Sequence, residues 1–199
     1  PGVPVTMETE LLREGKAVSQ AMVRMVQNGT TRLVALASFG SGRKSAVSVE
    51  SLAPPTAPAP EDCEPTLFIE GVMPSFAEFI EMRWCFGSRP FSGETHRDMG
   101  GWMQFREAPS NLGDPAIVAL IDAWPPVMLS HLTSFAPNSS LTWSVELMDP
   151  RPEVAPHDWL LYRAEIDRAA EGYGNTHAGI WNREGELVAI SRQTVTIFG

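Results

Sequence analysis

A unit of three strands that occurs twice limits the fold more than any other feature of this 199-residue sequence. In residues 5–39, two strands are followed by the turn Asn28-Gly29 and by a third strand that ends at Phe39. Residues 159–198 show the same order, with the turn Glu184-Gly185 before the last strand. Turns of this kind between apolar strands are signals of antiparallel hairpins. Repetition of a whole supersecondary unit predicts a duplicated fold.

The stretch between the two copies is predicted to hold more strands and one long helix. Strands are expected at residues 79–86, 102–106 and 141–147. Asp114-Pro115 has the pattern of a helix start, because an acidic N-cap precedes a proline at the first helical position. From residue 115 to residue 132, apolar side chains recur at helical spacing and are numerous enough to predict a largely buried helix.

A proline-rich stretch separates the two parts of the chain. Residues 51–65 contain five prolines, and proline interrupts both helices and strands. Such a segment is expected to be a semi-extended linker. We therefore predict three regions: residues 1–50 with the strands of the first copy, a Pro-rich linker at residues 51–75, and residues 76–199 with the second copy.

The composition argues against several classes of protein. A net charge of -9 is unsuited to general nucleic-acid binding, and no run approaches the ~18 apolar residues of a membrane span. Cys63 and Cys85 have no metal-ligand or disulfide-framework spacing. We interpret them as reduced thiols of a cytoplasmic protein, with pairing between them as the minor alternative. The four histidines show no metal-ligand spacing, so no metal is expected.

Several segments carry a resemblance to a known family. They are residues 11–16 (LLREGK), 27–29 (QNG), 37–39 (ASF), 120–126 (LIDAWPP), 158–162 (DWLLY) and 185–189 (GELVA). In order and spacing they resemble the type II acyl-CoA thioesterases. The resemblance implies an α+β fold of the double hot-dog kind, in which an antiparallel sheet wraps around a long helix and the unit is duplicated. It also implies hydrolysis of acyl-CoA to fatty acid and CoA by an activated water, with no covalent intermediate and no cofactor.

The resemblance further implies a set of three catalytic residues. An aspartate on the second-half helix, a hydroxyl at the start of the next strand and a glutamine on the last strand fall on Asp122, Ser140 and Gln193. Ser139 and Thr142 lie close enough to Ser140 that either could take the hydroxyl role.

The position of Asp122 suits a general base. It lies at the edge of the apolar arc of the predicted helix, where partial desolvation should raise its pKa. Pro125 and Pro126 follow, and because neither has an N–H, the carbonyls of Ile121 and Asp122 lose their usual partners. The alternative is a solvated acid at a helix edge.

Gln193 is the clearer signal from the residues alone. It is predicted to share an inward face with Leu187, Ala189, Val195 and Ile197. A carboxamide there must be hydrogen-bonded, because an unpaired one costs ~1–3 kcal/mol. A structural amide that holds a loop is the alternative. Ser140, by contrast, alternates in step with Thr142, Ser144 and Glu146, which places it on the polar face of its strand.

Two other functions remain open at this point. A hot-dog dehydratase would need a histidine working with an aspartate, and none of the histidines lies close to Asp122 in the sequence. A non-catalytic acyl-CoA-binding hot-dog protein is the alternative from a different class.

The three strands of the first copy start directly at residue 5. In the second copy, about 80 residues lie between the linker and the three strands. We therefore expect the first hot-dog unit to lack its N-terminal strand and helix in this chain. An upstream polypeptide, cleaved and still bound or on a separate chain, is expected to complete that unit. The resemblance also implies a homo-oligomer.

Overall fold

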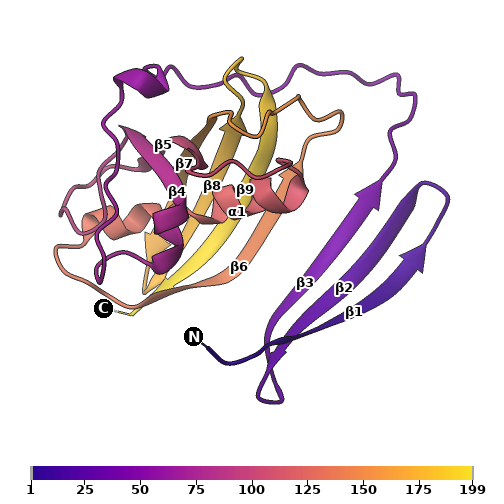
Figure 1. The fold of residues 1–199 in the computed structure, drawn as a ribbon, viewed down its shortest axis with the longest axis horizontal. Helices are drawn as coiled ribbons and strands as arrows, with labels where there is room; N and C mark the ends of the chain where they lie inside the picture. The colour runs from indigo at the N-terminus through magenta and orange to yellow at the C-terminus, as the bar shows by residue number, and fades with distance from the viewer. Residues whose placement is uncertain (1, 199) are drawn as a thin grey trace. The chain divides into compact units, whose positions relative to one another are not determined.

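A computed structural model of the protein describes residues 2–198 (Figure 1). Two compact units, Pro1–Ser48 and Val49–Gly199, divide the chain. In the first unit, strands β1 (Thr6–Glu14), β2 (Val18–Gln27) and β3 (Thr30–Gly40) form an antiparallel sheet in chain order. Asn28 and Gly29 have φ values of 51° and 70°, the conformation that a tight hairpin turn requires. The predicted three-stranded meander is therefore confirmed.

The first unit has one predominantly apolar sheet face. The register places Met7 opposite Met25 and Met25 opposite Leu33, so these three side chains share one face. Met7 is 58% exposed and Leu33 is 48% exposed. On the other face, Arg24 forms an ion pair with Glu8 at 3.2 Å. The three strands therefore leave much of their apolar face exposed.

The second unit is a six-stranded sheet with one α-helix against it. The strands are β4 (Ile80–Phe86), β5 (Asp98–Phe105), β6 (Asn138–Leu147), β7 (Leu160–Ala170), β8 (Tyr173–Trp181) and β9 (Leu187–Ile197). All neighbours pair antiparallel, in the order β4-β5-β7-β8-β9-β6. Helix α1 (Asp114–Asp122) lies across this sheet (Figure 1). The three short 3-10 helices are η1 (Pro60–Asp62), η2 (Ser75–Phe79) and η3 (Val127–His131).

Strand β5 starts four residues before the predicted position, at a pair of glycines. A Cβ on Gly100 would overlap the carbonyl oxygen of Tyr162, and a Cβ on Gly101 would overlap that of Arg83. Glycine at both positions therefore lets β5 lie close to β7 on one side and to β4 on the other. Gly-Gly suggests a loop in a sequence, but here it belongs to a strand.

The single long helix predicted for residues 115–132 is wrong. α1 ends at Asp122, and η3 follows as a separate short helix after Pro125 and Pro126. Proline lacks an N–H and clashes with the preceding turn, so the α-helix cannot continue through the pair. The helical spacing of apolar residues persists because both pieces bury side chains in the same core.

Two apolar clusters cover opposite faces of the sheet. The larger joins α1 and η3 to inward residues such as Ile166, Ala178 and Ala189. The smaller contains Leu187 and Trp181. Leu187 therefore does not share a face with Ala189 as predicted, because the register shifts between Ile180 and Trp181, where Ile180 pairs with Ala189 and Trp181 with Leu187.

The proline-rich stretch lies against the sheet on the side of the smaller cluster. The indole nitrogen of Trp181 donates to the carbonyl of Leu52 at 2.9 Å, and that of Trp102 donates to the carbonyl of Pro58 at 2.8 Å. Cys63 belongs to this stretch, and its Sγ lies 2.9 Å from Sγ of Cys85 on β4, both as free thiols. Two indoles thus hold the backbone of this stretch against the sheet.

Among residues 2–198, none of the helices is long and apolar enough to cross a membrane. The same residues hold no group of three or more His, Cys, Asp or Glu side chains that could bind a metal ion.

Candidate active site

Gln193 lies on β9 and projects to the face of the sheet that α1 covers. Its neighbour two residues earlier, Ser191, pairs with Ala178, which belongs to the α1-facing core. Because the register is regular from Ser191 to Gln193, the Gln193 side chain points to the same face. Its Nε2 donates a hydrogen bond to Oγ of Ser140 at 2.7 Å. The inward carboxamide is therefore paired, as the sequence predicts.

A β-bulge brings Ser140 to this face. The pairing of β6 with β9 shifts between Ser140 and Thr142, so that Ser140 lies opposite Val195 and Thr142 lies opposite Thr194. Thr194 and Val195 are consecutive residues of β9, so their side chains point to opposite faces. Their partners Thr142 and Ser140 therefore also point to opposite faces, and Ser140 shares the face of Val195 and Gln193. The predicted position of Ser140 on the polar face is wrong for this reason. Ser139, opposite Thr196, also faces away from Gln193.

Asp122 is the last residue of α1, between the buried residues Ile121 and Ala123. Its own side chain is exposed, yet the apolar surroundings raise the pKa of the carboxyl through desolvation. Within residues 2–198, no hydrogen bond joins Asp122 to Gln193 or Ser140. The structure thus brings Ser140 and Gln193 into contact and places the Asp122 helix over the same face of the sheet.

An aromatic row accompanies Asp122. Trp124 stacks on Tyr162 of β7 with ring centroids 5.3 Å apart and planes 5° apart, and Trp84 lies 5.0 Å from Trp124 on another side. Burial raises the pKa of Tyr162, and the negative charge of Asp122 raises it further. Tyr162 therefore stays a neutral phenol near the carboxylate. Nothing in the sequence marks Tyr162 as part of the site except that it is a phenol within the apolar run Leu160-Leu161-Tyr162.

The segment after Asp122 reaches β8, the strand that pairs with the strand of Gln193. Met128 of η3 lies over Gly174 of β8, so closely that a Cβ on Gly174 would overlap its side chain. Gly174 pairs with Val195, and Val195 pairs with Ser140. The chain that follows Asp122 therefore packs on the row of paired residues Gly174, Val195 and Ser140, at its Gly174 end.

Both parts of the chain match models of one protein family. Residues 60–197 match the acyl-CoA thioesterase C-terminal domain, and residues 1–40 match the acyl-CoA thioesterase N-terminal domain. The chain belongs to the acyl-CoA thioesterase family. No curated protein sequence matches it significantly.

Solved structures show the fold of this thioesterase family member. A conserved protein of unknown function with a hot dog fold from Alicyclobacillus acidocaldarius has a TM-score of 0.80 at 21% identity, over 98% of this chain and 73% of that chain. A putative thioesterase II from Thermobifida fusca YX has a TM-score of 0.76 at 20% identity, over 97% of this chain and 72% of that chain. The acyl-CoA thioesterase II TesB2 from Mycobacterium marinum has a TM-score of 0.76 at 21% identity, over 98% of this chain and 74% of that chain. The predicted α+β hot-dog fold is confirmed.

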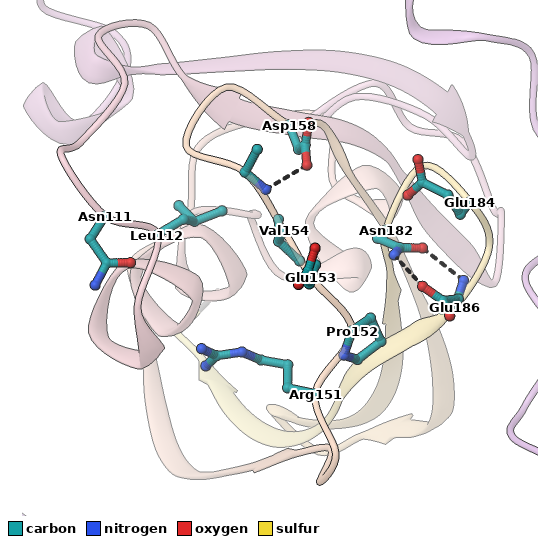
Figure 2. Close-up of a pocket in the computed structure, with 11 residues that line it drawn as sticks. Asn111, Leu112, Arg151, Pro152, Glu153, Val154, Asp158, Asn182, Glu184 and Glu186 are labelled. Carbon is teal, nitrogen blue, oxygen red and sulfur yellow. Dashed lines mark hydrogen bonds between the residues drawn. The ribbon is translucent and has the colours of Figure 1, made fainter.

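The larger of two cavities in the described residues (Figure 2) is not lined by Asp122, Ser140 or Gln193. Its volume is about 690 Å³, and it opens among the loop after β6, the approach to α1 and the β8–β9 turn. Four carboxylates and one guanidinium line it: Glu153, Asp158, Glu184, Glu186 and Arg151. Asn182 is hydrogen-bonded to Glu186 through both atoms of its side-chain amide. This negative lining is unsuited to a ligand that carries phosphates.

A smaller hollow of about 290 Å³ is lined by Gln193 and by residues of β6, β7, β8 and β9, including Asp167 of β7. Several of its side chains belong to the sheet face opposite α1. Ser144 and Arg192 pair with each other and are adjacent in sequence to Trp143 and Gln193, which face α1, so they point the other way. On that face Asp167 binds His177 and Arg192, each at 2.7 Å. The charged groups of this hollow are thus already paired.

Proposed function

We propose that the chain is an acyl-CoA thioesterase that releases fatty acid and CoA by attack of an activated water on the thioester. Asp122 is the general base, and Ser140 and Gln193 hold the water. The observation that carries this proposal is the 2.7 Å hydrogen bond from Gln193 Nε2 to Ser140 Oγ on the α1-covered face.

Thioester hydrolysis needs few groups. The leaving thiol of CoA has an ordinary thiol pKa near ~8.5, so it can depart as a thiolate without a strong general acid. The site must hold a water molecule and remove one proton from it. A carboxylate with a raised pKa is a better proton acceptor than an ordinary aspartate, and desolvation raises the pKa of Asp122.

The hydrogen-bond direction between Ser140 and Gln193 leaves the right atoms free. Because Nε2 of Gln193 donates to Oγ of Ser140, the serine hydroxyl keeps its own proton to donate. The carbonyl oxygen of the Gln193 amide is free to accept. A water beside the pair can therefore donate one hydrogen bond to Gln193 and accept one from Ser140. When this water attacks the thioester, Asp122 takes the proton of its other O–H bond.

Two of the four histidines are bonded to groups other than Asp122, which favours hydrolysis over dehydration. A hot-dog dehydratase would need a histidine beside Asp122. His131 is bonded to the carbonyl oxygen of His96 at 2.8 Å, and His177 is bonded to Asp167 at 2.7 Å on the opposite face of the sheet. Neither is available to work with Asp122.

The test is turnover of an acyl-CoA series with detection of free thiol. We expect steady release of CoA in large molar excess over protein, with Gln193→Ala lowering the rate at least tenfold. Ser144→Ala, on the same strand pair but the opposite face, is the control and should match the unaltered protein. Stoichiometric binding of acyl-CoA without release would instead identify a non-catalytic binding protein.

A further inference from the structure

We propose that Trp143 and Ser191 are positioning residues that fix the side chain of Gln193 for catalysis. This inference rests on the proposed function and extends it to two residues outside the catalytic set. Trp143 lies directly opposite Gln193 in the β6–β9 pair, and both side chains share the α1-covered face.

Two hydrogen bonds cross this strand pair in opposite directions. The indole Nε1 of Trp143 donates to Oγ of Ser191 at 2.8 Å, while Gln193 donates to Ser140 at 2.7 Å. Ser191 pairs with Val145, and Val195 pairs with Ser140. The ring of Trp143 therefore leans toward one end of the ladder and the carboxamide of Gln193 toward the other.

The anchor of this arrangement is buried. Ser191 is only 6% exposed, and its oxygen accepts the bond from the indole. Breaking that bond would leave a buried hydroxyl short of a partner, so the indole is held in one orientation. Its bulk then occupies the space on the Ser191 side of Gln193.

On its other flank Gln193 is bounded by Thr176 of β8, its second partner in the sheet. Thr176 is 7% exposed, and its hydroxyl lies 3.4 Å from the backbone carbonyl oxygen of Gln193. With Trp143 on one side and Thr176 on the other, the flexible glutamine keeps the rotamer that reaches Ser140. Trp143 thus acts on the reaction through Gln193 and does not itself touch the reacting atoms.

The experiment measures steady-state hydrolysis of an acyl-CoA by variants of the full chain. Trp143→Phe keeps most of the ring and removes the N–H, and Ser191→Ala removes the acceptor. We expect each to lower kcat about tenfold with KM nearly unchanged, because positioning of the water is lost while substrate binding is kept. Ser191→Thr keeps the hydroxyl and should restore most of the rate, and thermal unfolding shows whether each variant folds.

A double mutant decides whether the effect passes through Gln193. Adding Trp143→Phe to Gln193→Ala should lower the rate no further than Gln193→Ala alone. If the two losses multiply, or if both single variants keep the full rate while Gln193→Ala does not, the positioning role is wrong and the proposed function stands. If Gln193→Ala itself keeps the full rate, both are wrong.

Discussion

Ser140 and Gln193 lie 53 residues apart in the sequence, and a 2.7 Å hydrogen bond joins their side chains on one face of the sheet. The bond depends on the bulge between Ser140 and Thr142, since a regular strand would turn the hydroxyl to the opposite face. A local irregularity of β6 therefore assembles two of the three proposed catalytic groups.

Replacement of Ser140 tests its role against its neighbours. Ser140→Ala removes the hydroxyl that holds the water, and we expect the hydrolysis rate to fall about tenfold to a hundredfold. Ser140→Thr keeps the hydroxyl and should retain most of the activity. Ser139→Ala and Thr142→Ala are matched controls whose side chains face away. If Ser139→Ala or Thr142→Ala lowers the hydrolysis rate as much as Ser140→Ala does, that residue and not Ser140 holds the water.

The pH dependence of hydrolysis should report the state of Asp122. The base acts only when ionised, and desolvation raises its pKa above the usual aspartate value. Activity should therefore fall as the pH is lowered through this raised pKa, at a higher pH than an ordinary aspartate would give. A kcat/KM profile that stays flat down to the ordinary aspartate range would contradict this.

The same shift has a consequence for stability. A carboxyl whose pKa is raised on folding stabilises the fold fully only below its unfolded pKa, and that contribution is lost as the pH rises through the folded pKa. At neutral pH, Asp122→Asn should thus unfold at the same temperature as the unaltered protein or higher. A marked loss of thermal stability would mean that the carboxylate holds the fold together.

The contact between the end of the Met128 side chain and Gly174 should limit what β8 can carry at this position. Gly174→Ala places a Cβ where the Met128 side chain lies, and overpacking of this kind costs about 1–3 kcal/mol. Met128→Ala in the same chain removes the obstacle, so the double variant should lose less stability than the sum of the two single changes. Denaturant unfolding measures all four proteins, and strict additivity would contradict the contact.

Cys85 should resist alkylation in the folded protein. Burial, followed by the hydrogen bond and the charge of Cys63, raises the pKa of Cys85 to about 12, so very little thiolate exists at pH 8. Iodoacetamide should modify Cys85 quickly in urea and very slowly without it, as followed by mass spectrometry. Fast modification of the folded protein would show that the thiol is exposed or ionised.

The sequence predicts that each strand exists, although β5 and β6 start before their predicted positions, and it predicts the repeated unit and the inward carboxamide. Each of these has a local pattern of period two or a turn signal. The bulge at Ser140 and the shift that turns Leu187 away from Ala189 have no such pattern, since both arise from pairing with distant strands. Helical spacing continued across Pro125 and Pro126 because one core receives both α1 and η3. Tyr162 comes near Asp122 only because Trp124, which follows α1, stacks on it from across the fold.

The most direct test of the catalytic proposal is the rate of CoA release by Asp122→Asn, measured beside the unaltered chain at saturating acyl-CoA. The change keeps the size of the side chain and removes the base, so we expect at least a ~100-fold lower rate. Circular dichroism and acyl-CoA binding should be unchanged. Hydrolysis by a folded Asp122→Asn protein at the rate of the unaltered chain would show that Asp122 is not the base.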